Sequence, residues 1–201
     1  MGGRMTCREL EGPMIPAILL GVVLLVLLCV PISVYNALIA RKNQTVNLFG
    51  TIDALLKKRH DLIPNLVASV KEYMKHEREL LTKVTEERAR AMSGQLSEQD
   101  RMKTENAIGR YLRGIMVAVE NYPNLKANEH VLQLLAALNE VEEQISAARR
   151  AYNAAVTDYN NAVQMFPSNL FATMMGFAPK QVLETPEEER KPVDVDALFK
   201  S

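Results

Sequence analysis

The chain has 201 residues, and 24 Lys and Arg balance 24 Asp and Glu, so its formal net charge is zero. This length allows one domain and one accessory segment. A neutral chain without an aromatic-rich basic patch is not typical of a nucleic-acid-binding protein, and we expect no nucleic-acid partner. Glycine is sparse, tryptophan is absent, and Ala, Leu, Glu, Lys, Arg and Met dominate. Because these residues lose least on entering a helix, the composition predicts an almost entirely helical protein.

The N-terminal part contains a long apolar stretch. No charged residue occurs between Met14 and Ala40, and residues 15–32 read IPAILLGVVLLVLLCVPI. About 20 residues of helix cross a bilayer core. The stretch therefore predicts a transmembrane anchor over residues 13–40, preceded by a leader over residues 1–12, and the membrane lipid bilayer is an expected partner.

Three other interpretations of this stretch remain open. A cleaved secretory signal has a shorter apolar core and a small-residue cleavage site, and no good site follows here. Lipid attachment at Cys29 requires small residues before it, but Leu27 and Leu28 stand there. N-myristoylation at Gly2 is suggested only by a short pattern that includes Thr6. A retained single-pass anchor is the interpretation that we favour.

Positive charges flank the apolar stretch unevenly. Arg4 and Arg8 precede it, whereas Arg41 and Lys42 follow it closely and residues 57–59 are again cationic. Lys and Arg concentrate on the cytoplasmic side of membrane proteins. We therefore expect the C-terminal part of the chain to lie on the cytoplasmic side.

Apolar residues recur at helical spacing after the anchor and predict one amphipathic helix from about Gln44 to Ala91. The motif KKRHDLIPN within it has two interpretations. Its leading cationic side chains suit the end of one helix, with Asp61 as the N-cap of the next. The apolar stripe, however, keeps its phase across this junction. We therefore favour a single helix kinked at Pro64, whose missing N–H frees the carbonyl of His60.

The next helix is marked by a break and a cap. Gly94 interrupts the helical pattern, and Ser97 is followed three residues later by Asp100 in an arrangement like a capping box. The helix that begins there is expected to end near Asn121, just before a proline.

The remaining helices complete a bundle. A third helix is expected from near Asn128 to just before Pro167, and Ser168–Gly176 reads as a short helix capped by its serine and closed by its glycine. We expect an all-α fold: a transmembrane helix followed by an antiparallel bundle of three long helices plus a short fourth. The bundle is expected to cover residues 41–177, and residues 178–201 to form an extended or flexible tail.

The third helix carries the clearest pattern in the chain. Apolar or aromatic residues recur with gaps that alternate between three and four, which is a heptad seam for packing against partner helices as in a coiled coil. We expect the opposite, charged face to be solvated, so that Glu142 and Arg150 are surface residues. The seam residues are Val131, Leu134, Leu138, Val141, Ile145, Ala148, Tyr152, Ala155, Tyr159, Ala162 and Phe166.

Histidines are the natural candidates for a metal or catalytic site, and none of them stands in a known pattern. His60 and Asp61 are adjacent, so they point about 100° apart on a helix. Glu72 and His76 share a face, but a helical metal site needs Glu-x-x-His pairs, which do not occur in this sequence. His130 follows a glutamate at a helix start. We therefore expect no enzymatic activity, no catalytic residue, no cofactor and no metal ligand.

Four blocks of this sequence resemble successive motifs of the LemA family, in the family's order. The resemblance covers most of residues 35–177 and implies a bacterial single-pass membrane protein with a helical domain of four-helix type. It implies no agreed activity, and some members of the family belong to magnetosome membranes. The tail contains no motif that we can assign. The blocks are YNALIARKNQTV, IDALLKKRHDLIPNLVASVKEYMKHE, LRGIMVAVENYPNLKANEHVLQL and AARRAYNAAVTDYNNAVQMFP.

Two functions are compatible with this reading. The first is a membrane-anchored, self-associating helical scaffold of the bacterial envelope or an internal membrane. We expect a homo-oligomer because the short second helix cannot cover two longer ones, which would leave apolar seam exposed for a neighbouring chain. The alternative is an envelope-associated enzyme or ligand-binding protein with a pocket in the bundle. The sequence identifies no protein partner.

Overall fold

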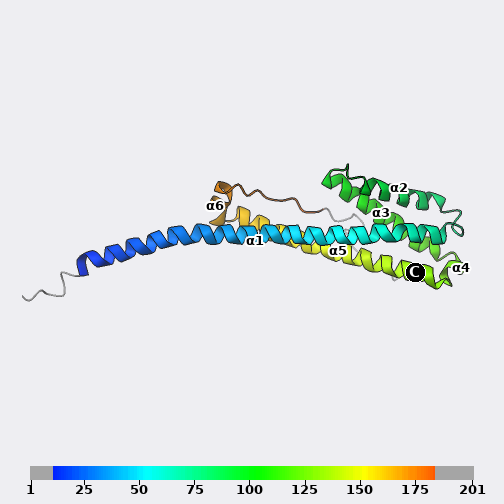
Figure 1. The fold of residues 1–201 in the computed structure, drawn as a ribbon, viewed down its shortest axis with the longest axis horizontal. Helices are drawn as coiled ribbons and strands as arrows, with labels where there is room; N and C mark the ends of the chain where they lie inside the picture. The colour runs from blue at the N-terminus through cyan, green and yellow to red at the C-terminus, as the bar shows by residue number, and fades with distance from the viewer. Residues whose placement is uncertain (1–10, 184–201) are drawn as a thin grey trace, which may run out of the picture. The chain divides into compact units, whose positions relative to one another are not determined.

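The computed structural model describes residues 11–183, and within this range all regular secondary structure is helical (Figure 1). The expected all-α fold with a long apolar N-terminal helix is confirmed. The helices in chain order are α1 (Glu11–Val70), α2 (Arg78–Met92), α3 (Glu98–Val119), α4 (Pro123–Lys126), α5 (Glu129–Gln164) and α6 (Ser168–Met174).

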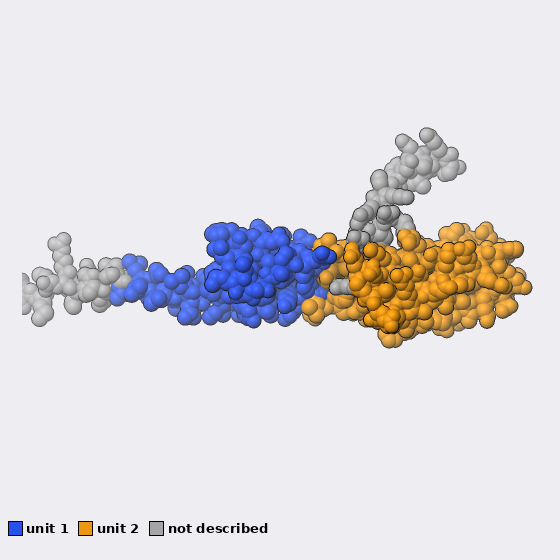
Figure 2. Space-filling model, turned by 90° about the horizontal axis from the view of Figure 1, so that it is seen from above, with its two compact units in different colours: residues 1–45, 155–181 blue, residues 46–154, 182–201 orange. Residues whose placement is uncertain are grey.

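The chain forms two compact units, drawn in different colours in Figure 2. Unit 1 comprises residues 1–45 and 155–181, and unit 2 comprises residues 46–154 and 182–201. Helices α1 and α5 each contribute to both units. The core of unit 2 is built from α1, α2, α3 and α5, with Leu125 of the short α4 also buried.

Helix α1 joins the apolar stretch to the amphipathic pattern without interruption. Among the described residues it is the one helix long and apolar enough to cross a membrane, judged by length and composition. Its apolar side chains near the N-terminus, such as Leu24 and Leu27, are exposed, whereas Ile52 and Leu66 further along are buried. A single helix thus carries both a surface suited to lipid and a surface suited to a protein core.

The helix predicted over residues 44–91 is broken after Val70, so this prediction is wrong. Residues 71–77 form a turn, and α2 folds back, as shown by a hydrogen bond from Arg88 Nε to the carbonyl oxygen of His60 at 2.7 Å. The turn is held by Met74, which is fully buried, and by the carboxylate of Glu77, which accepts a hydrogen bond from the Tyr122 hydroxyl. The chain continues as helix through Pro64, so no break occurs at the junction of His60 and Asp61.

Helices α3 and α5 follow the sequence pattern closely. Ser97 is the N-cap of α3, and its hydroxyl accepts a hydrogen bond from the backbone N–H of Asp100 at 3.1 Å. In α5 the seam is buried from Val131 to Tyr159, whereas Ala162 is partly buried and Phe166 is exposed. The expected seam is therefore confirmed except at its C-terminal end.

Helix α6 ends as its sequence predicts but begins differently. Gly176 has a φ of +73°, and the N–H of Phe177 donates to the carbonyl of Ala172 at 2.9 Å, which together make a Schellman motif. At the other end Pro167 occupies the N-cap position and makes no side-chain cap. Ser168 is the first helical residue, and its hydroxyl donates instead to the carbonyl of Met165.

The first residues of the expected tail, Ala178–Leu183, are fixed to α5 and form what we call the strap. The side-chain amide of Asn160 exchanges two hydrogen bonds of 2.8 Å with the backbone of Lys180. The amide of Asn153 does the same with the backbone of Leu183, at 2.9 and 2.8 Å. This part of the tail is extended and held against α5 by these side-chain hydrogen bonds. Residues 184–201 lie outside the described part of the chain.

Candidate functional site

The most concentrated polar chemistry in unit 2 is a buried charge network centred on Arg59. Gaps of three and four along α1 place the arginine on the stripe of core residues, where it is only 1% exposed. Glu105 occupies the equivalent position on α3 and is fully buried. The apolar residues that share these stripes are Ile52, Leu56, Ile63, Leu66 and Val70 on α1, and Ile108, Leu112, Ile115 and Val119 on α3.

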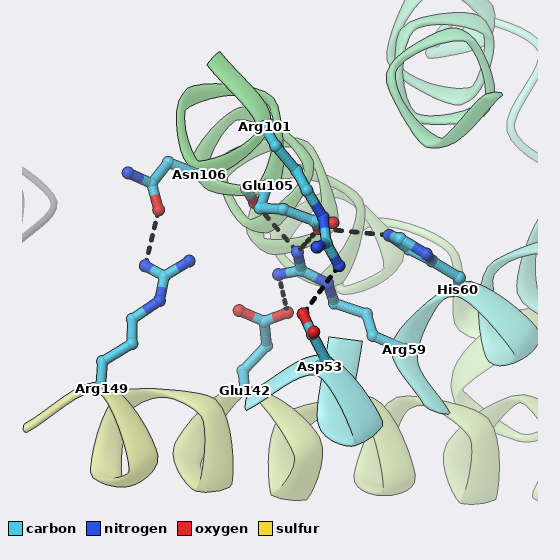
Figure 3. Close-up of polar contacts among 8 residues, drawn as sticks. All are labelled: Asp53, Arg59, His60, Arg101, Glu105, Asn106, Glu142 and Arg149. Carbon is cyan, nitrogen blue, oxygen red and sulfur yellow. Dashed lines mark hydrogen bonds and ion pairs between the residues drawn. The ribbon is translucent and has the colours of Figure 1, made fainter. Parts of the chain in front are cut away.

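Arg59 ties three helices together (Figure 3). Its Nη2 donates to the carboxylate of Glu105 and to the backbone oxygen of the same residue at 3.1 Å. Its Nη1 donates to Glu142 Oε1 on α5 at 2.8 Å. Gly109 makes room for this contact, because a Cβ at that position would lie 3.1 Å from Glu142 Oε2. Arg59 thus bridges carboxylates from two different helices.

His60 extends the network toward α2. Its Nε2 lies 3.1 Å from Glu105 Oε2, on the same carboxylate oxygen that Arg59 contacts. The backbone carbonyl of His60, which lacks an N–H partner at Pro64, accepts instead from Arg88. The carbonyl group that Pro64 was predicted to free is thus used in a contact between α1 and α2.

The ionisation of Glu105 is set by opposing effects. Burial alone would raise the pKa of this carboxyl. The hydrogen bond from His60 and the charge of Arg59 oppose burial and outweigh it, so the pKa of Glu105 lies below its usual range. The network therefore holds a carboxylate in its charged form inside the bundle.

Around the network there is almost no free space. A cavity of about 20 Å³ lies against Arg59, Glu105 and Glu142, which is room for about one water molecule. Ligand sites usually measure ~300–1,000 Å³. Ser146 also lines this cavity, and its hydroxyl accepts a hydrogen bond from Arg150 Nη1 at 2.9 Å. The network binds three helices to one another, and the cavity beside it is far smaller than the usual ligand site.

Further polar contacts flank the network on both sides. Arg101 Nη2 donates to Asp53 Oδ1 at 2.9 Å, and Arg149 Nη1 donates to Asn106 Oδ1 at 2.6 Å. The face of α5 that we expected to be solvated is therefore partly engaged in contacts. Glu142, predicted to be a surface residue, is instead a partner of the buried Arg59.

The structure does not bring the three histidines together. His60 is buried in the network, whereas His76 lies exposed in the turn after α1 and His130 lies exposed in the first turn of α5. Within residues 11–183, no group of three or more His, Cys, Asp and Glu side chains is placed to hold a metal ion.

The sequence pattern did not point to Arg59 or Glu105 as site residues, and it predicted Glu142 to be a surface residue. The first two carried a usable signal, since each is a charged residue in phase with an apolar stripe. Such a residue predicts a buried ion pair, with its partner on a facing helix. Glu142 lies beside the seam of α5 rather than in it, and no local pattern distinguishes it from the exposed Glu140 and Glu143.

Comparison with known proteins gives a consistent result. Residues 48–197 match the LemA family, so the match extends into the tail, where no motif was assigned. Protein LemA of Metamycoplasma hominis is 26% identical over 163 residues, which is 81% of this chain and 74% of that protein.

Shorter similarity links the chain to magnetosome proteins. MamQ 2 of Paramagnetospirillum magneticum is 30% identical over 94 residues, and MamQ of Magnetospirillum gryphiswaldense is 31% identical over 72 residues. These matches cover 47% and 36% of this chain, but only 33% and 25% of the two MamQ proteins. The family match covers most of the described bundle, and this chain therefore belongs to the LemA family.

Proposed function

We propose that this protein is a membrane-anchored, self-associating helical scaffold without catalytic activity. The observation that carries the proposal is the continuity of α1, which extends from Glu11 to Val70. Its first part exposes an uninterrupted apolar surface, and its last part supplies the core stripe of unit 2. The bundle is thereby covalently tied to a membrane-spanning segment through one helix. The positive charges that follow the span favour a cytoplasmic bundle in a bacterial envelope or internal membrane.

The interior of the bundle supports a structural role. The buried Arg59 of α1 pairs with a carboxylate from α3 and another from α5, and the adjoining cavity is too small for a substrate. Removing one partner of such a network is strongly destabilising, whereas the network itself adds little net stability. Buried charges of this kind serve to fix which helices pack together and in which register.

Self-association is best supported by the membrane-spanning segment. Within unit 2 the fold-back of α2 covers apolar surface that we expected to remain open. In the span, Ala17 and Gly21 place two small residues one helical turn apart, and nothing lies within 4 Å of a Cβ built on Gly21. Small residues at this spacing allow two helices to approach closely in a membrane.

The test is the mass of the full-length protein in mild detergent, measured by multi-angle light scattering with the detergent contribution removed. We expect a multiple of the single-chain mass, and a shift toward one chain in Gly21→Ile. Leu20→Ile is the matched control, because it conserves volume beside the small residue and should not change the mass. A single-chain mass for the wild type over a wide concentration range would refute self-association.

A ligand-binding function is the second candidate, and one groove favours it. The groove measures about 460 Å³ and lies where α1 turns into α2. Apolar side chains, among them Val67, line it together with three cationic residues and two carboxylates, so that the cations exceed the anions by one. The charged residues are Lys71, Lys75, Arg78, Glu72 and Glu86. Apolar and cationic side chains together suit an anionic ligand with an apolar body.

Native mass spectrometry of the purified full-length protein tests this second function. A bound small molecule should appear as added mass in the wild type and should be lost in Lys71→Glu combined with Lys75→Glu. The exposed Lys57→Glu serves as the control. Added mass that persists in the double variant would place the ligand elsewhere.

A further inference from the structure

Unit 1 contains two uncharged segments that pack against each other. Residues 14–40 of α1 carry no charged side chain, and neither do residues 159–179, which include the end of α5 and all of α6. The two segments share a small core in which Leu38 contacts Tyr159, Val163 and Ala172. An uncharged hairpin end thus lies beside the last uncharged turns of the candidate membrane span.

Helix α6 exposes a row of large apolar side chains. Phe166 is 80% exposed and Met174 is 84% exposed, with Leu170 between them also exposed. Leu170 and Met174 are four residues apart on α6 and share a face, whereas Ala172 faces the core of unit 1 and is fully buried. Phe166 is exposed in the turn just before the helix. Exposed apolar rows of this kind mark interaction surfaces. We call Leu170 and Met174, together with Phe166 in the turn before the helix, the outer face of α6.

The position of α6 along α1 identifies what covers this face. Residues 14–40 extend roughly 40 Å as a helix, which matches the ~40–45 Å of a bilayer including both headgroup layers. The core of unit 1 includes Val34 and Leu38, near the end of that length. In Figure 1, α6 runs across α1 rather than along it, beside the apolar part of α1. When α1 crosses a bilayer along its length, a short helix at this level and in this direction would lie in the plane of the headgroup layer.

Aromatic and cationic contacts at the same level fit a membrane surface. The rings of Tyr35 and Phe177 meet edge to face at 6.0 Å, and Lys42 Nζ lies 5.9 Å from the centre of the Phe177 ring. Tyrosines and lysines are typical of the boundary between lipid and water. Charged residues occur again beyond this layer, where Lys180 Nζ donates to Thr45 Oγ1 at 2.6 Å.

We propose that the outer face of α6 inserts into the headgroup layer of the same bilayer that α1 crosses. The partner is the lipid surface, and the outer face forms a second attachment that prevents unit 1 from tilting away from the membrane. This inference rests on the membrane anchoring proposed above. A groove of about 580 Å³ between α1 and α5 opens at the same level, lined by Val34 and Ala37 and, one turn on, by Arg41. Its lining also includes polar side chains and the carboxylate of Asp158, so the groove itself carries both charges.

The experiment uses the full-length protein in phosphatidylcholine and phosphatidylglycerol vesicles. Cys7 and Cys29 are first replaced by Ser, and Met174→Cys is labelled with an environment-sensitive fluorophore. Val117→Cys is the matched control, because Val117 is also a strongly exposed apolar residue, 66% exposed, but belongs to unit 2. Lipids with spin labels at two depths then quench the fluorophore.

We expect blue-shifted emission at Met174→Cys and stronger quenching by the shallow spin label than by the deep one, with neither effect at Val117→Cys. Equal, weak quenching at both positions in vesicle-bound protein would overturn the inference and leave the anchor intact. Blue-shifted emission that disappears when the protein is diluted in lipid would assign the outer face to a second copy of the chain and also overturn it. Protein that does not remain with the vesicles would refute the anchor itself, and with it this inference.

Discussion

Arg59 is a charged residue in a position that the α1 stripe otherwise reserves for apolar side chains. Its partner Glu105 is fully buried, so replacing the arginine with Met leaves a buried carboxylate whose remaining side-chain partner is His60. We expect Arg59→Met to lower the free energy of unfolding by ~3–5 kcal/mol. Thermal melts of the full-length protein in mild detergent, followed by circular dichroism at 222 nm, measure the loss.

The control for this prediction lies two residues away. Lys57 is exposed and pairs with Asp61 at 2.8 Å, so Lys57→Met should change stability by less than about 1 kcal/mol. Adding Glu105→Leu to Arg59→Met should restore part of the stability, because the buried carboxylate is removed. A double variant as unstable as Arg59→Met would show that the cost comes from packing and not from charge.

From the lowered pKa of Glu105 we predict how the stability of the folded protein changes as the pH falls. Burial acts to raise the pKa, but the His60 hydrogen bond and the Arg59 charge lower it overall. The folded pKa is thus below the unfolded value of about 4.3, so the stabilisation is complete above that pH and is lost as the pH falls through the folded pKa. We expect Glu105→Gln to melt at lower temperature near pH 7 and to show a shallower decline below about pH 4.3 than the wild type. Parallel declines in the two proteins would exclude Glu105 as the group responsible.

Pro64 and Arg88 are coupled through one carbonyl group. The proline leaves the His60 oxygen without its helical N–H partner, and Arg88 supplies a donor at 2.7 Å. We expect Arg88→Ala to cost ~1.5–3 kcal/mol in the wild type but clearly less in Pro64→Ala, where the helix supplies its own N–H. A double-mutant cycle from chemical unfolding gives this coupling energy, and a value near zero would contradict the compensation.

At the scale of elements, the spacing of apolar residues predicted the helices, but it did not predict the reversal of the chain after Val70. The α5 seam could be read because its gaps alternate over the whole helix, and Ser97 was recognisable as a cap of α3. The turn after Val70 contains no Gly or Pro, and apolar residues keep helical spacing on both sides of it. Only the burial of Met74 against distant residues reveals the reversal, and such a contact has no local sequence signal.

The strap shows a second contact that local patterns do not reveal. Asn153 and Asn160 are seven residues apart on α5, about 10.5 Å along the helix. Their partners Leu183 and Lys180 are three residues apart, which is about 10 Å in extended chain. Each amide therefore meets a backbone donor and acceptor without strain.

Proteolysis tests the strap at a defined bond. Asn160→Ala removes both hydrogen bonds to the backbone of Lys180, so trypsin should cleave after Lys180 several-fold faster than in the wild type. The neighbouring Asn161→Ala, which changes an exposed side chain, is the matched control. Mass spectrometry identifies the cleavage site. Equal cleavage rates in both variants would show that Asn160 does not fix the strap.

At the scale of the whole molecule, the single helix α1 is suited to two environments, lipid along its first part and a protein core along its last part. The apolar part of α1 is exposed and requires lipid, whereas the part from Ile52 onward is buried by protein. Because the two surfaces do not overlap, the anchor can be disabled without touching the core of unit 2. We expect Leu24→Arg combined with Leu25→Arg to release the protein from membranes during a carbonate wash, since each central arginine costs about 2.5–3.5 kcal/mol of insertion free energy.

The released protein also tests whether the bundle depends on the span. Unit 2 buries its own apolar core and its own charge network, so the variant should still melt cooperatively once it is in solution. Leu24→Ile combined with Leu25→Ile is the matched control and should stay in the pellet. If the arginine variant pellets as the isoleucine variant does, the single-span anchor is wrong. If it is released but melts without cooperativity, the anchor is correct and the bundle draws its stability from the membrane.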